Sequence, residues 1–202
     1  MSYFKYFSLS YLFSSAFCML LDFTVPGLRV KTNDKQKIKE DYLKILPVAF
    51  TNLILAWPVL DLSENYLRYQ QRNNYPFFPN VLFWLLVADF IFYFAHLLLH
   101  SKSLYYFHSL HHEYDYSYGA GAFYAHPVDF MFANLLPIIS PLLIFKPPDY
   151  FIHLVAIFAT AYTVIVSHSS FKIFSFSHLN HHIYRTKNYG LFLTDKLLGT
   201  KK

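Results

Sequence analysis

Histidines are the residues of this chain most suited to chemistry, because they occur in three tight sets. The chain has 11 histidines and one cysteine, so imidazole is its abundant metal donor. Residues three and four apart share one face of a helix, and eight histidines have this spacing: His96 and His100; His108, His111 and His112; His178, His181 and His182. Neutral imidazole is the commonest metal ligand among side chains. Because a single zinc takes about four protein ligands, eight predict two metals.

The alternative is that these are ordinary helix-end or interfacial histidines, but a histidine at membrane depth is costly to leave unpaired. Imidazole suits iron, copper, zinc and nickel alike. A zinc metalloprotease would carry its general-base glutamate at the position of Leu97. The lone Cys18 excludes intramolecular disulfides and multi-cysteine zinc or iron–sulfur frameworks. Without a hydrolytic carboxylate or nucleophile nearby, a redox metal is favoured, and we expect iron.

The composition predicts that membrane helices position these histidines. Hydrophobic residues make up 55% of the 202 residues and charged residues only 14%, against about 25% charged in an average soluble domain. We expect membrane segments in five uncharged runs: Tyr6 to Leu21, Ile45 to Leu60, Asn73 to Ser101 (broken by Asp89), Phe130 to Phe145 and Tyr150 to Phe171. Several are shorter than the roughly 20 residues of a full span, so some are expected to be partial. We interpret the first as a retained anchor and not a cleaved signal peptide.

The connections between these runs predict which segments share a membrane face. Pro147 and Pro148 interrupt the helix between the last two runs, so the chain turns back there as a hairpin. Residues 22–44, 101–127 and 171–202 then lie on one face and carry 13 of the 17 lysines and arginines. The positive-inside rule makes this face cytosolic. All three histidine sets fall on it, and no basic run long enough to indicate nucleic-acid binding occurs.

The order HxxxH, HxxHH, HxxHH resembles the fatty acid hydroxylase and sterol desaturase superfamily of membrane-bound di-iron oxygenases. The resemblance covers about Asn80 to Lys202, which we take as a catalytic domain at 80–202 after N-terminal membrane anchor helices and a basic loop at 1–79. Phe107 to Tyr114, Tyr124 to Asp129 and Thr186 to Gly190, with Asp195, Gly199 and Thr200, are similar to the C-4 methylsterol oxidase branch. The His-Pro-Val-Asp string at 126–129 is also similar to the sterol C-5 desaturases.

The resemblance implies an all-α integral membrane bundle with a cytosolic, histidine-rich di-metal cap. Its implied ligands are the eight spaced histidines and His168, while His126 either completes the ligand shell or orients its loop. We expect no catalytic side chains beyond these ligands, and we exclude His153 as a packed or interfacial residue. Asp89 either fixes an imidazole tautomer or pairs with another helix. Asp129, Asn180 and Asn188 are weaker candidates for residues that support the ligands.

The expected function is an O2-dependent oxidoreductase of the endoplasmic reticulum membrane, with two irons per chain. The best-matching reaction is C-4 methylsterol monooxygenation, and the alternatives are sterol C-5 desaturation, side-chain hydroxylation and fatty-acyl hydroxylation. Gly119-Ala-Gly121 is followed by Tyr124 where a nucleotide fingerprint has its third glycine. Electrons are therefore expected from a cytochrome b5 and its NAD(P)H-dependent reductase, docking on the basic face. Two other classes are a zinc-dependent membrane lipid hydrolase and a non-catalytic metal transporter or scaffold.

Overall fold

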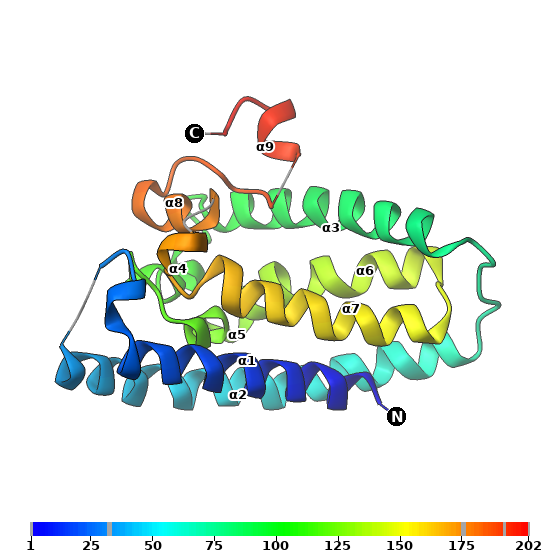
Figure 1. Cartoon of the computed structure of the whole chain (residues 1–202). Helices are drawn as coiled ribbons and strands as arrows, with labels where there is room; N and C mark the ends of the chain where they lie inside the picture. The colour runs from blue at the N-terminus through cyan, green and yellow to red at the C-terminus, as the bar shows by residue number, and fades with distance from the viewer. Residues whose placement is uncertain (1, 32–33, 175–176, 192, 202) are drawn as a thin grey trace.

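The computed structural model describes residues 2–31, 34–174, 177–191 and 193–201, and these residues form helices and connecting loops without a β-strand. Figure 1 shows the long helices lying roughly side by side along one axis. The α-helices are α1 (Tyr3–Thr24), α2 (Lys35–Arg68), α3 (Phe77–Leu99), α4 (Tyr105–His108), α5 (Pro127–Asp129), α6 (Leu136–Phe145), α7 (Asp149–Ala161), α8 (Ser177–Tyr184) and α9 (Thr194–Leu197). Two π-helices, η4 (Phe130–Leu135) and η5 (Tyr162–Ser167), continue α5 into α6 and extend α7.

Five helical segments are long and apolar enough to cross a membrane, which confirms the predicted class and number of spans. They are Tyr3–Thr24, Lys35–Arg68, Phe77–Leu99, Pro127–Phe145 and Asp149–Ser167. The expectation that some spans are only partial is wrong, because the helices continue past the uncharged runs. In α2 the buried acids that interrupt the apolar pattern are each paired one turn away, Asp41 with Lys37 at 2.8 Å and Glu64 with Arg68 at 2.6 Å.

The loops gather at the two ends of the bundle as the topology predicted. At one end, Asn73 N donates to the carbonyl of Lys146 at 2.9 Å, which joins the loop after α2 to the Pro-Pro turn. At the other end, Arg29 pairs with Phe171 in an isolated β-bridge and donates to the carbonyl of Tyr116 at 2.9 Å. This second end also holds α4 and α8, which carry histidines (Figure 1).

The N-terminal helices are part of the same core as the histidine-bearing segments. Phe7 and Tyr11 of α1 are buried and stack on Phe123, with ring centroids 5.4 and 4.1 Å away. In α2, Asn52 donates to the carbonyls of Phe123 and Ala125 at 2.9 and 2.8 Å. The loop between the second histidine set and Asp129 is therefore held from beneath by α1 and α2.

Candidate metal centre

Four separate segments bring nine histidines to one end of the bundle. His96 lies in the last turn of α3, and His100 caps that helix. The short helix α4 and the 3-10 turn η2 (His111–Glu113) follow and carry His108, His111 and His112. His168 caps the π-helix η5, and α8 carries His178, His181 and His182. The helical spacing seen in the sequence is thus realised, and tertiary packing joins the three sets.

The nine side chains divide into two groups in which one ring nitrogen of each histidine lies within 4.8 Å of the others in its group. Group one consists of His96, His100, His108, His112 and His181; group two consists of His111, His168, His178 and His182. Each group takes members from different sets, because consecutive residues such as His111 and His112 point to different groups. These are the nine histidines that the resemblance implied as ligands, with His126 outside both groups.

Hydrogen bonds behind the rings show which nitrogens face each other in group one. His96 Nδ1 lies 2.8 Å from the Tyr189 carbonyl oxygen, and His108 Nδ1 lies 2.8 Å from the Asp129 carboxylate. Because a carbonyl or carboxylate oxygen only accepts, the neutral rings carry their protons on Nδ1 and present lone pairs at Nε2. The two Nε2 atoms lie 3.1 Å apart. Two lone pairs cannot form a hydrogen bond, and a cation between them would resolve this conflict.

The same arrangement recurs around both groups. His181 Nδ1 donates to the carbonyl of Lys187 at 2.7 Å, so its bare Nε2 faces His112 Nε2 at 3.2 Å. His168 Nδ1 donates to the carbonyl of Thr163 at 2.8 Å, and its Nε2 faces those of His111 and His178 at 3.3 and 3.2 Å. Both ring nitrogens of His182 are buried without a hydrogen-bond partner among the described residues. The donor set therefore fits two metal ions, one in each group.

Burial keeps these rings in the neutral form that binds metals. Desolvation lowers the pKa of His100, His108 and His181 to about 3, and that of His168 to about 4, from an ordinary value of 6.5. The same cause lowers the pKa of the other group members outside the spans still further: His111, His112, His178 and His182. Neutral imidazoles at physiological pH need no proton release before they coordinate.

The remaining candidates lie around the groups. Asp129 contacts His108 as a supporting residue should, while the Nδ1 of His126 accepts from Val128 N at 3.2 Å and caps α5. His126 thus orients its loop, and the structure does not bring it to either group. Asn180 is half-buried on α8. Asn188 is buried, has a left-handed backbone with φ 57°, and donates its N–H to the carbonyl of Thr200 at 3.0 Å.

Asp89 acts on the site through the backbone that follows Tyr189. Its carboxylate accepts from the N–H groups of Leu191, Leu193 and Thr194 at 2.6 to 2.9 Å. Asp195 accepts from the N–H of Tyr189 at 2.9 Å. Together the two acids hold the segment whose carbonyl fixes the His96 tautomer. A side chain at Gly190 would meet Asp89 Oδ1 at 2.9 Å and Asp195 Oδ2 at 3.1 Å, so glycine allows both carboxylates to approach.

Some contributors to the site carry no signal that sequence reasoning can use. The carbonyls of Thr163, Lys187 and Tyr189 fix three imidazoles, and any residue type supplies a carbonyl. The excluded His153 packs against the rings of Tyr3 and Tyr6 with centroids 5.4 and 4.6 Å away. This packing agrees with its exclusion.

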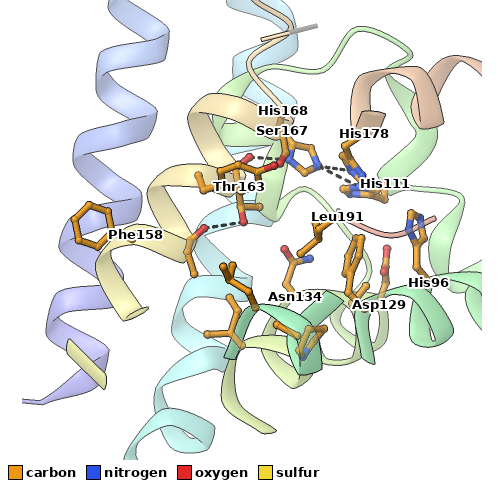
Figure 2. Close-up of a pocket in the computed structure, with 18 of the residues that line it drawn as sticks. His96, His111, Asp129, Asn134, Phe158, Thr163, Ser167, His168, His178 and Leu191 are labelled. Carbon is orange, nitrogen blue, oxygen red and sulfur yellow. Dashed lines mark hydrogen bonds between the residues drawn. The ribbon is translucent and has the colours of Figure 1, made fainter. Parts of the chain in front are cut away.

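A cavity of about 290 Å³ opens beside the histidines between α3, α6 and α7 (Figure 2). His96, His108, His111, His168 and His178 line one part of it together with Asp129. Most of its remaining wall is apolar: Trp84, Leu85, Ala88, Phe92, Ala133, Pro137, Ile138, Phe158, Ala159 and Leu191. These helices are among the predicted spans, so the cavity lies where an apolar ligand from the membrane could reach both histidine groups.

The bundle and its paired histidine groups define a multi-helix membrane protein with a site for two metals. Residues 81–200 of the 202 match the family model for fatty acid hydroxylase. The chain therefore belongs to the fatty acid hydroxylase family, and the resemblance inferred from the histidine spacing is confirmed. No solved structure matches the chain.

Three relatives show how the similarity is distributed. Fatty acid hydroxylase ahd1 of Mycosarcoma maydis is 31% identical over 182 residues, 80% of this chain and 46% of that protein. Methylsterol monooxygenase 2-2 of Arabidopsis thaliana is 44% identical over 64 residues, 31% of this chain and 24% of that protein. Very-long-chain aldehyde decarbonylase GL1-11 of Oryza sativa is 45% identical over 64 residues, with the same coverages. The chain spans between about a quarter and just under half of these relatives, and the hydroxylases and monooxygenases among them support an oxidoreductase.

We expect Asp129→Asn to weaken metal binding by about 10- to 100-fold, the usual effect of removing a carboxylate that orients a metal-bound histidine. The amide lacks the charge that holds the proton on His108 Nδ1, so the ring can change tautomer. Metal content after dialysis against graded chelator would measure this. Asp149→Asn is the matched control, since that acid is exposed at the opposite end of the bundle and pairs with Arg72. Equal retention of metal by both variants would contradict the prediction.

Proposed function

We propose that this chain is an O2-dependent di-iron monooxygenase that oxidises a C–H bond of a sterol lipid, with the C-4 methyl group of a sterol precursor as its target. The observation that carries the proposal is the pair of histidine groups with bare ring nitrogens beside an apolar cavity among the spans. Group one would hold one iron and group two the other. Bound iron would supply the redox chemistry that activates dioxygen toward an unactivated C–H bond.

The chain's own residues would position the lipid and keep the centre dry. Phe92, Trp84 and Phe158 would contact the lipid skeleton, because they line the cavity from α3 and α7. Asp129 and the carbonyl of Tyr189 would hold protons on the Nδ1 atoms, so that the Nε2 atoms stay available to metal. The apolar wall would exclude water from the reacting carbon.

We further propose that the protein resides in the endoplasmic reticulum membrane with the histidine end toward the cytosol. Exposed basic side chains at that end support docking of an acidic electron donor: Lys35, Lys37, Lys39, Lys102, Lys172, Arg185 and Lys187. A cytochrome b5, reduced by its NAD(P)H-dependent reductase, would fit that surface.

Fatty-acyl hydroxylation is the second candidate, because the match to a fungal fatty acid hydroxylase covers 80% of this chain. The sterol proposal is supported by the higher identity to a methylsterol monooxygenase, 44%, over a shorter stretch. Both candidates use the same metal centre and differ in the lipid that enters the cavity.

The test is metal content and product formation in microsomes of a host that lacks its own C-4 methylsterol oxidase. We expect two irons per chain and O2-dependent loss of 4-methylsterols, both diminished in the His111→Ala variant. Iron with hydroxylation of acyl lipids and no sterol loss would establish the second candidate. Zinc with turnover that needs neither O2 nor reductant would overturn the oxygenase and indicate a hydrolase.

A further inference from the structure

Asn134 is a polar residue that the metal centre does not explain. It lies on η4, inside the predicted span Pro127–Phe145, and lines the cavity among mostly apolar side chains. Figure 2 shows its side chain directed into the cavity. A carboxamide among apolar groups is costly to leave without a partner, so a residue of this kind needs a reason to be there.

The other neutral polar groups around the cavity already have partners. Trp84 Nε1 donates to the carbonyl of Ile138 at 3.1 Å, and Thr163 Oγ1 donates to the carbonyl of Ala159 at 2.8 Å. Ser167 and Tyr162 are hydrogen-bonded to each other through their side chains. The structure gives the Asn134 carboxamide no such bond within the described part of the chain. It is therefore available to a group that enters the cavity.

The π-helix sets how far this amide lies from the metal centre. A π-helix repeats at i to i+5, so Asn134 lies one turn after Asp129 on the same face, and both line the cavity. Five residues at about 1.5 Å each correspond to roughly 7 Å along the axis. Asp129 itself contacts His108 of group one at 2.8 Å. A ligand group held by Asn134 would thus lie close to the reacting carbon.

We propose that Asn134 is the polar recognition group of the cavity and binds a hydroxyl or carbonyl oxygen a few bonds from the carbon that is oxidised. This inference rests on the proposed function and restricts its substrate class. A 3-hydroxysterol oxidised at its C-4 methyl group meets the requirement, since three bonds separate the oxygen from that methyl carbon. The remote methyl end of an unsubstituted acyl chain does not.

Ligand binding without turnover tests this inference separately from catalysis. Trp84 lines the cavity and Trp57 of α2 is exposed, so Trp57→Phe leaves one tryptophan that reports binding by its fluorescence. The metal-loaded protein, without reductant, would be titrated with 4,4-dimethylcholestan-3β-ol and its 3-deoxy analogue. A second pair, 1-hexadecanol and hexadecane, tests the same polar group on a straight chain.

We expect at least one hydroxylated ligand to bind about tenfold more tightly than its deoxy partner, the effect of one hydrogen bond to an otherwise unpaired buried group. Asn134→Leu should remove this preference and leave affinity for the deoxy ligand within about twofold. Asn65→Leu, at an exposed position on α2, is the matched control and should retain the preference. If Asn134→Leu loses metal, Asn134→Ala removes the amide without adding bulk.

The outcomes separate the inference from the proposed function. Discrimination only in the straight-chain pair would support the role of Asn134 while overturning the sterol substrate. Discrimination that survives in Asn134→Leu and Asn134→Ala would overturn the role of Asn134 and leave the sterol proposal intact. Equal affinity of wild type for both members of both pairs would also overturn it.

Discussion

The variant His108→Ala should lose about half of the bound metal, and its turnover should fall by at least about 100-fold, the upper end of the effect of removing a supporting residue. His108 Nε2 lies 3.1 Å from His96 Nε2 and 3.0 Å from His112 Nε2, so its loss opens group one at its centre. The variant also leaves the buried Asp129 carboxylate without its imidazole partner. Elemental analysis of the purified protein, with a turnover assay on the same sample, would measure both effects.

His126→Ala is the matched control, because this histidine precedes Asp129 by only three residues and yet lies outside both groups. Its ring caps α5, and losing such a cap costs about 1 kcal/mol of stability. We expect the variant to retain both metals. Loss of a metal from His126→Ala would return this residue to the ligand set, and retention of two metals by His108→Ala would refute the assignment of group one.

The variant Arg29→Met should lower the free energy of unfolding by about 3 to 5 kcal/mol, the cost of removing one partner of a buried ion pair. Arg29 and Asp22 are fully buried and lie 2.9 Å apart. The guanidinium also donates to the carbonyls of Tyr116, Ser117 and Ser169 at 2.9 to 3.2 Å. For a chain of this size the melting temperature should fall by about 10 °C, measurable by thermal unfolding in detergent.

Two further variants test the cause of that loss. Lys31→Met removes an exposed basic residue from the same loop and should change stability by less than about 0.5 kcal/mol. Arg29→Met combined with Asp22→Asn should recover part of the loss, because the carboxylate is then no longer buried without its partner. Equal melting temperatures for Arg29→Met and Lys31→Met would show that the buried pair contributes little. Because Ser169 adjoins His168, loss of metal from group two in Arg29→Met would link this pair to the site.

Much of the fold could be predicted because membrane helices depend on local composition. An uncharged run of sufficient length must form a helix in a bilayer, where every backbone polar group needs a partner. Pro147 and Pro148 mark the hairpin for an equally local reason. Length was underestimated, since counting charges stops a span at Asp41 or Glu64, whereas in the helix each acid pairs with a basic residue one turn away.

Local patterns could not show the connections between distant segments. Arg29 counted in the sequence as one of the basic residues of a cytosolic loop, but the structure buries it completely. Asp89 was expected to support an imidazole or another helix, yet its described contacts are with the backbone at 191–194. Both side chains gain their partners from segments 87 to 140 residues away, and no spacing rule reaches that far.

The sequence by itself determined that this is an α-helical membrane protein with three histidine sets, because helix periodicity places residues three and four apart on one face. It also determined the family, through the order and spacing of those sets. Only the tertiary structure decided that the sets mix into two groups, that His126 caps a helix, and that Asn134 faces the cavity. These features depend on how the ends of α3, α4, η5 and α8 pack, and on backbone carbonyls that set the imidazole tautomers. Such contacts form between segments whose neighbours are chosen by the whole bundle.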